Sequence, residues 1–357
     1  MQCMRRPLII ALLVSGFGLF AQWTSPSELQ EFAFRRADST WRPEVLGFVR
    51  NTEFFHPAEQ GRTRFGVLVG TRRRFDAGAG RTVDLGVLVH QAFGAGPKFL
   101  PLVMLRHQTS WSEVNFGSIT DRGHGLPRQL LNPDLFYSVP VAYGLSGTAQ
   151  LGGFRTHYWA EWLSAIDYGS PFKERIHAGG TAAWSRGQFA LNGLVQYHHV
   201  GGQIDSDPGP GGNRLNFGAF GSAGIGSSVV KVAQLYYADP LQVFSAERRG
   251  RGTSAEFLLR LHDKVQAEFS YWNGSNFQAP LGQGLFQSRN PEDPGAWHQK
   301  SRQLLGFALA YEGSSSARLR FWYDLGGRGW QPSITWVRYL VLDPLEGSKR
   351  SRGRVPQ

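Results

Sequence analysis

The most informative pattern in the chain is a nearly regular alternation of apolar and polar residues, from which only Trp322 departs between residues 315 and 325. Between residues 315 and 325 the apolar positions are Ala317, Leu319, Phe321 and Tyr323, and the charged positions are Arg318, Arg320 and Asp324. The stretches 82–93 and 264–272 repeat this pattern. Because successive side chains of a strand point to opposite faces, each segment has one apolar face and one polar face. The pattern therefore predicts strands that separate an apolar environment from water.

Similar segments recur along the whole chain and predict sixteen strands. They lie at 45–55, 61–75, 81–94, 98–109, 111–119, 135–148, 154–167, 174–187, 188–201, 213–226, 227–239, 252–262, 264–273, 300–312, 315–325 and 332–343. Several connections are short and rich in Gly, Ser and Asp, whereas 120–134, 202–212, 240–251 and 274–299 are long. Short turns at one rim and long loops at the other are typical of bacterial outer-membrane barrels. We therefore predict an all-β protein, a closed antiparallel transmembrane β-barrel of about 16 strands, within a range of 14 to 18.

The N-terminus predicts export from the cytoplasm. Arg5 and Arg6 precede an uncharged apolar run from Leu8 to Phe20, and Ala21 offers a small residue before a cleavage point. This order is typical of a secretory signal peptide, which we place at residues 1–21. An uncleaved anchor is the alternative, but the run is shorter than the roughly 20 residues that a transmembrane helix needs.

The remainder of the chain divides into three parts. Residues 22–44 form an N-terminal leader, in which Ser25 and Glu28 resemble a capping box and predict a short helix near 26–35; a disordered leader is the alternative. The barrel is predicted at 45–343, and a basic tail at 344–357. An outer-membrane location follows from the signal and the strands together.

Composition and charge narrow the class further. The chain has 45 Gly, 25 Phe and 11 Tyr, the residue types that serve hairpin turns and the aromatic girdles of a barrel. A propeller or a secreted sandwich is the alternative on composition alone, but no repeat of roughly 40 to 50 residues is visible. The formal charge of +11 could indicate nucleic-acid binding, yet an exported chain without a binding motif argues against it. Much of the positive charge lies in local clusters of Lys and Arg, which are interpreted as solvated loops or contacts to lipid head groups.

One region resembles a known group of proteins. The runs NFGSITDRGHGLPRQLLNPD (115–134) and FRTHYWAEWLSAIDYGSPFKERIHAGG (154–180) are similar to segments of uncharacterised porin-like outer-membrane β-barrel proteins of Gram-negative bacteria. The likeness lies mainly in residues 112–180, and the matching positions are Trp159, Glu161, Trp162, Pro171, Phe172 and Glu174. The resemblance implies the barrel fold and an outer-membrane location. It implies no chemistry.

Charged residues within the predicted strands are candidates for the inner wall. A carboxylate in the middle of a spanning strand is costly if it faces lipid, so such residues are expected to face the lumen. The lumen-lining candidates are Arg64, Asp84, His90, Arg106, Glu113, Arg155, His157 and Glu161. They would shape the field of a pore, or they would form a salt-bridge ladder that only stiffens the wall.

The long loop at 120–134 supplies a second group of candidates. Long charged loops of barrels often fold inward, so Arg122, His124 and Arg128 are predicted to form a constriction, with a plain exposed loop as the alternative. No metal site, cofactor or catalytic residue is predicted. No G-x-S-x-G motif is present, and the adjacent His198 and His199 point to opposite faces of a strand.

The predicted function is therefore that of a porin-like channel for passive diffusion of small polar, and in one interpretation anionic, solutes. The chain is not predicted to be an enzyme. Two alternatives remain open: an outer-membrane barrel enzyme acting on lipid, and a non-conducting structural or adhesin-like barrel. The expected partners are outer-membrane lipids and small polar solutes. A homo-oligomer is a further possibility, and no nucleic-acid partner is expected.

Overall fold

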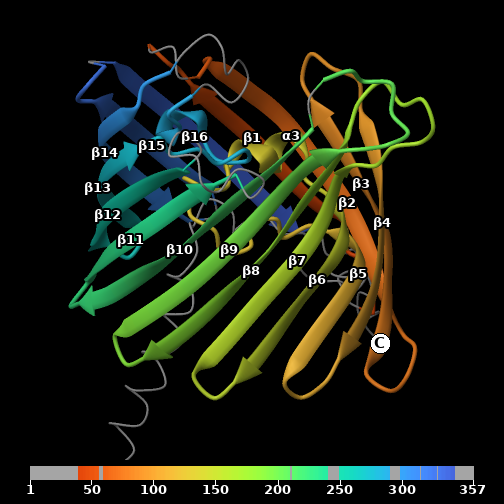
Figure 1. Ribbon diagram of the computed structural model, residues 1–357. Helices are drawn as coiled ribbons and strands as arrows, with labels where there is room; N and C mark the ends of the chain where they lie inside the picture. The colour runs from red at the N-terminus through yellow and green to blue at the C-terminus, as the bar shows by residue number, and fades with distance from the viewer. Residues whose placement is uncertain are drawn as a thin grey trace, which may run out of the picture.

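Sixteen antiparallel strands close into a single barrel in the computed structural model (Figure 1). The structure describes residues 39–55, 59–209, 211–239, 249–289, 298–313, 315–327 and 329–341. Each strand pairs with its neighbours in the sequence, and β1 pairs with β16 to close the ring. The predicted fold class and the central value of sixteen strands are both confirmed. The predicted signal peptide, the leader helix and the basic tail lie outside the described residues.

The strands are β1 (Glu44–Thr52), β2 (Arg62–Asp76), β3 (Arg81–Ala92), β4 (Lys98–Gln108), β5 (Ser112–Ile119), β6 (Ala142–Leu151), β7 (Phe154–Ser164), β8 (Glu174–Arg186), β9 (Phe189–Gly201), β10 (Gly212–Ile225), β11 (Ser228–Ala238), β12 (Arg249–His262), β13 (Val265–Ser275), β14 (Ser301–Glu312), β15 (Ser315–Asp324) and β16 (Trp330–Val341). A short helix, α3 (Asp134–Ser138), and a 3-10 turn, η3 (Gly284–Phe286), interrupt the long loops. Among the described residues, no helix is long and apolar enough to cross a bilayer.

The alternation sorts side chains to the two faces as predicted. Phe321 is 38% exposed on the outer face, whereas the adjacent Arg320 is 4% exposed on the inner face. Leu85 and Phe269 are likewise exposed outside, next to inward-facing Asp84 and Glu268. A charge on the lipid face costs about 2–4 kcal/mol at the bilayer midplane. This cost fixes the register, because a slip by one residue would turn every charge outward.

One predicted strand is wrong at its beginning. The sequence predicts a strand from 135 to 148, but β6 begins only at Ala142, and residues 134–138 form α3. Pro133 occupies the N-cap position with helical backbone angles, and Pro140 separates the helix from β6. Proline suits the start of a helix because it lacks an N–H group, whereas it cannot donate to a ladder. The loop between β5 and β6 is therefore longer than predicted.

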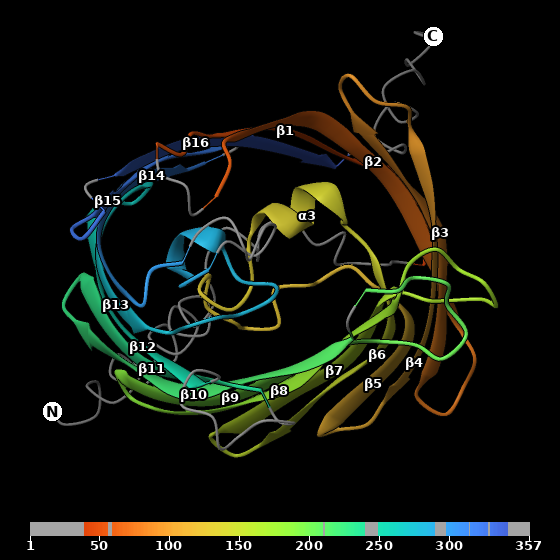
Figure 2. The same ribbon diagram turned by 45° about the horizontal axis from the view of Figure 1, so that its top comes forward.

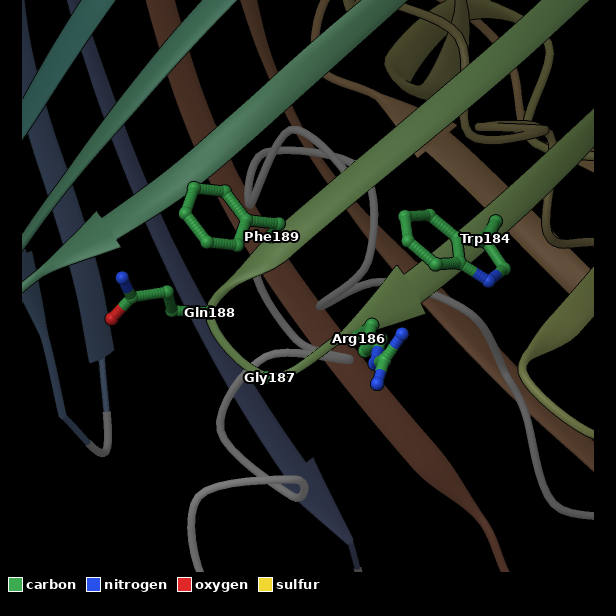
Figure 3. A pocket seen from close by; sticks show the side chains of 5 residues that line it. All are labelled: Trp184, Arg186, Gly187, Gln188 and Phe189. Atoms are coloured by element: carbon green, nitrogen blue, oxygen red, sulfur yellow. The ribbon is translucent and has the colours of Figure 1, made fainter.

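Aromatic residues mark the rim that carries the short turns. Trp184 and Phe189 flank the turn between β8 and β9, where Gly187 adopts a left-handed conformation with φ of 59° (Figure 3). Together with Arg186 and Gln188 they line a shallow hollow of about 500 Å³. Trp184 is 36% and Phe189 55% exposed. Exposed aromatics at this level are typical of the girdle where a barrel meets lipid head groups.

Candidate functional site

Two loops fold into the interior of the barrel. Viewed along the barrel, α3 and the 3-10 turn η3 lie inside the ring of strands (Figure 2). They belong to residues 120–141, between β5 and β6, and residues 276–289, which follow β13. We call these two segments together the plug. Hydrogen bonds join them, because the backbone N–H of Asn132 donates to Leu281 O at 2.6 Å, and that of Gln283 donates to Arg128 O at 3.2 Å.

The plug builds an apolar core inside the barrel. Its buried apolar side chains are Leu126, Leu130, Leu131, Phe136, Tyr137, Val141, Phe277, Ala279, Leu281, Leu285 and Phe286. They form one cluster with inward-facing residues of β1–β4, β7, β9, β11 and β13–β16, including Phe48, Trp159, Trp272 and Trp322. The interior of the barrel is therefore apolar, not polar, at this level. The inner face carries apolar residues wherever the plug covers it.

Charged side chains fix the loop 120–141 to three different parts of the wall. Arg122 reaches Glu161 on β7, Arg128 donates from Nη2 to Glu268 Oε1 on β13 at 3.0 Å, and Asp134 pairs with Arg50 on β1. Each of these side chains is nearly inaccessible to solvent. Buried charges are tolerated when they are paired, so these contacts hold the loop in a defined position. The predicted constriction-loop residues Arg122, His124 and Arg128 all lie inside the barrel.

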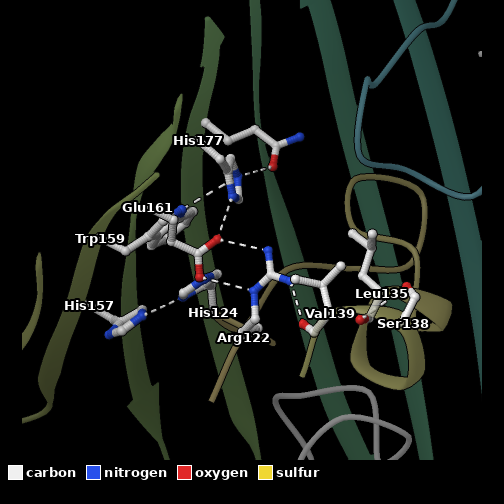
Figure 4. Close-up of polar contacts among 10 residues, drawn as sticks. Arg122, His124, Leu135, Ser138, Val139, His157, Trp159, Glu161 and His177 are labelled. Atoms are coloured by element: carbon white, nitrogen blue, oxygen red, sulfur yellow. Dashed lines mark hydrogen bonds and ion pairs between the residues drawn. The ribbon is translucent and has the colours of Figure 1, made fainter. Parts of the chain in front are cut away.

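The first of these contacts belongs to a larger group, which we call the inner cluster: Arg122, His124, His157, Glu161 and His177 (Figure 4). The Glu161 carboxylate is fully buried and lies between two imidazoles. His124 Nε2 is 2.8 Å from Oε1, and His177 Nδ1 is 3.3 Å from Oε2. Arg122 donates from Nε to Oε1 at 3.3 Å and from Nη2 to Oε2 at 3.2 Å.

Aromatic packing holds the imidazole rings of the inner cluster. The His124 ring stacks on Trp159, with ring centroids 4.3 Å apart and an angle of 7° between the planes. His124 Nδ1 also lies 3.0 Å from Nε2 of His157. His124 comes from the loop, whereas Glu161 and His177 are directly paired on β7 and β8. The cluster therefore joins the plug to the wall.

A second charged group lies where the plug meets the rim that carries the long loops. We call it the rim cluster: Arg50, Glu59, Arg64 and Asp134. Glu59, in the loop between β1 and β2, is 7% exposed, and its Oε2 accepts a hydrogen bond of 3.1 Å from the backbone N–H of Leu285. Burial, reinforced by the negative charge of Asp134, raises the pKa of Glu59 to about 7. Glu59 can therefore bind and release a proton near neutral pH.

The remaining predicted lumen residues also lie on the inner face, but they do not join either cluster. Asp84 accepts a hydrogen bond of 2.8 Å from Arg74 Nε, and Arg106 donates to Glu113 at 2.7 Å. These pairs have the form of the wall-stiffening ladder that the sequence left as an alternative. His90 is buried near Phe48, and Arg155 is exposed on the inner face near the short turns.

Several members of the two clusters were not predicted from the sequence. His177 stands on the inner face of β8, and alternation alone could have placed it there, but only the register of β7 and β8 sets it beside Glu161. Arg50 could have been found in the same way on β1. Glu59 and Asp134 lie in loops that carry no periodic signal. Their meeting depends on the path of the plug.

Comparison with known proteins adds a family to this geometry. The sequence profile of the lipid A 3'-O-deacylase-type family matches residues 40–344, which include all sixteen strands. The chain belongs to this family. No match was found among curated protein sequences. The family membership was not predicted, although an enzyme acting on lipid was one of the alternatives.

Solved structures share the architecture of this deacylase-type chain. A loop-deletion mutant of OmpT, an outer membrane protein of Vibrio cholerae, has a TM-score of 0.56 at 11% identity and covers 84% of this chain and 99% of its own. OpdL of Pseudomonas aeruginosa has a TM-score of 0.51 at 10% identity, covering 85% and 99%. At such identities the likeness concerns the fold alone. With its apolar outer face, the deacylase-type chain is an outer-membrane β-barrel, as predicted.

Proposed function

We propose that this barrel hydrolyses an ester-linked acyl chain of lipid A in the outer membrane. The observation that carries the proposal is the family match across residues 40–344, because it covers the barrel and both loops of the plug. The apolar core inside the barrel supports it, since a lumen filled by packed side chains is suited to rigid support of a site rather than to free diffusion.

The rim cluster offers the group that such a reaction needs. Hydrolysis requires a base that takes a proton from water while the water oxygen attacks the ester carbonyl carbon; the acyl–oxygen bond then breaks and the sugar hydroxyl receives a proton. A base is most effective when its pKa lies near the working pH. The pKa of about 7 makes Glu59 our candidate for this base.

The surroundings of Glu59 suit a phosphorylated glycolipid. Arg62 and Arg64 lie on the inner face of β2 beside it, and guanidinium groups bind phosphate through paired hydrogen bonds. In bacterial barrels the long loops face the cell exterior, and lipid A forms the outer leaflet. A rim site at the long loops is therefore on the side of the membrane where lipid A is found.

Mass spectrometry of lipid A tests the proposal. The full chain is expressed in a Gram-negative host whose lipid A carries an ester-linked acyl chain at the 3' position, and correct folding is checked by heat-modifiable migration on a gel. We expect the lipid A mass to fall by that acyl group. A folded protein in the outer membrane that leaves lipid A unchanged would contradict the proposal.

Two isosteric variants locate the base. Glu59→Gln keeps the size of the side chain but cannot accept a proton at neutral pH, so lipid A should remain intact. Glu113→Gln makes the same change at a carboxylate that pairs with Arg106 on the inner wall near the short turns, and deacylation should continue. Activity retained in Glu59→Gln would assign the base to another residue.

The predicted diffusion of small polar solutes stays as a second candidate function. The strand number favours it, because a barrel of 16 strands is wide enough to leave an aqueous channel wherever its lumen is not filled by the plug. Single-channel recording in a planar bilayer tests it. Discrete steps for the intact protein would support a channel, and a silent membrane with folded protein would contradict it. Homo-oligomers also stay a prediction; OmpT has been solved in a trimer form.

A further inference from the structure

We propose that His124, Glu161 and His177 form a binding site for a divalent transition-metal ion of the zinc type. The inference goes beyond lipid hydrolysis and does not depend on it, because Glu59 at the rim takes no part. Within the described part of the chain, this is the one group of three or more His, Cys, Asp and Glu residues whose ligand atoms converge, all within 4.8 Å of one another. Two imidazoles and a carboxylate are a ligand set that zinc uses in proteins.

The hydrogen bonds around His177 are compatible with a metal ion next to the carboxylate. The amide nitrogen of Gln196 donates to a backbone carbonyl and to Asn216 Oδ1, so its oxygen is the atom that faces His177 Nε2, at 3.2 Å. The indole N–H of Trp159 approaches the same nitrogen at 3.4 Å, the longer of the two contacts. With a proton on Nε2, His177 donates to Gln196 and its Nδ1 lone pair is directed at Glu161; with the proton on Nδ1, Nε2 accepts from Trp159 and Nδ1 donates to Glu161.

In the tautomer with the proton on Nε2, the Nδ1 lone pair and the Glu161 oxygen, 3.3 Å apart, can both coordinate one metal ion. Metal-ligating histidines commonly donate their other ring N–H to an oxygen, which fixes the tautomer and the ring orientation. Gln196 is placed to do this for His177, and the stacking of Trp159 orients the ring of His124.

The site would act as a clip between the plug and the wall. His124 belongs to the loop, whereas Glu161 and His177 are adjacent on β7 and β8. A bound ion would therefore cross-link a segment that is otherwise fixed by hydrogen bonds, ion pairs and packing. Because the three ligands are at most 4% exposed, the ion would be taken up while the loop folds into the barrel.

Arg122 allows a test of the metal site, because its guanidinium would compete with the ion for the Glu161 carboxylate. Its guanidinium donates to both oxygens of Glu161, so part of the negative charge is already compensated. A metal site predicts that removal of this guanidinium strengthens metal binding. A plain hydrogen-bond network predicts that no variant of the cluster binds the ion.

The experiment uses the full chain, refolded from denaturant into detergent micelles in the presence of Zn²⁺ or Co²⁺ and then freed of excess ion. We expect one Zn²⁺ per chain by elemental analysis, visible absorption bands of tetrahedral Co²⁺, and a Zn²⁺-dependent rise of the Tm. Arg122→Gln should bind severalfold more tightly. His177→Ala should weaken binding on the order of 100-fold or more.

His198→Ala is the matched control, because His198 is also buried on the inner face, directly paired with His177 on β9, and contributes no ligand atom. It should bind one ion with unchanged affinity. Wild-type protein that retains no ion would overturn the proposal. Equal binding by wild type and His177→Ala would overturn it as well, because the ion would then be held elsewhere.

Discussion

The inner cluster and the rim cluster both contain residues of the same loop, yet the buried carboxylates in them have different neighbours. Glu161 is surrounded by Arg122, His124 and His177, so each of its oxygens receives a charged or polar partner. Glu59 accepts a backbone hydrogen bond from Leu285 and lies beside a second acid, Asp134. The first arrangement stabilises an ionised group and fixes structure. The second raises the pKa of the carboxyl group toward neutral pH, which suits a group that must bind and release a proton in a reaction.

Burial alone therefore does not identify a functional acid. Both carboxylates are less than a tenth exposed, and both lie where the plug meets the wall. The number and sign of the neighbouring charges decide whether the pKa of a buried carboxyl group is lowered, so that it stays ionised, or raised toward neutral pH.

The largest effect is expected from deletion of residues 121–130, which removes loop residues of the inner cluster only. The change removes Arg122, His124 and Arg128 but leaves Asp134 and the rim cluster. Because the inner half of the plug disappears while every strand keeps its partners, we expect a folded barrel that gains single-channel conductance in a planar bilayer. Conductance equal to that of the intact protein would mean that the rim cluster and residues 276–289 are sufficient to close the barrel.

An isosteric pair compares the two carboxylates directly. Glu161→Gln leaves the buried Arg122 without an anionic partner, so the free energy of unfolding should fall by about 3–5 kcal/mol. Glu59→Gln makes the same chemical change where the native group is already largely neutral below pH 7, and the free energy of unfolding should change little. Urea unfolding in lipid vesicles at pH 6 measures both. Equal losses would remove the distinction.

The pH dependence of folding isolates Glu59. Its pKa rises from 4.5 to about 7 on folding, so the folded state holds a proton that the unfolded chain releases in this interval. The contribution is fully present below pH 4.5 and is lost as the pH rises through 7, with a size of about 3 kcal/mol. We expect the fall in unfolding free energy between pH 4.5 and 7 to be smaller in Glu59→Gln. Identical profiles for variant and wild type would argue against the raised pKa.

The smallest effect concerns the geometry of Arg50. Its Nη1 donates to Thr335 Oγ1 at 3.0 Å while the guanidinium pairs with Asp134. Arg50→Lys keeps the charge but cannot make both contacts in the same way, so the unfolding free energy should decrease by about 1 kcal/mol. Thr335→Val removes the same hydrogen bond from the other side. If the two changes are fully additive, the hydrogen bond contributes nothing measurable.

The barrel, the number of strands and the inward or outward direction of the strand side chains could be predicted from the sequence. These properties follow from alternation and from the turn residues, which are local features of the chain. Phe321 faces outward and Arg320 inward because neighbouring side chains of a strand must diverge and a charge is excluded from lipid. For the same reason Glu161 and His157 could be assigned to the inner face before any partner was known.

Only the tertiary structure decided what those inward residues meet. His177 lies beside Glu161 because of the register between β7 and β8, and His124 reaches them because the loop turns into the barrel. The strand predicted at 135–148 failed at its beginning, since Pro133 stands at the N-cap of a short helix and Pro140 separates that helix from β6. Glu59 shows the same limit most clearly. Its proton affinity depends on Asp134, 75 positions away in the chain, and on burial under the plug, and neither contact leaves a periodic trace in the sequence.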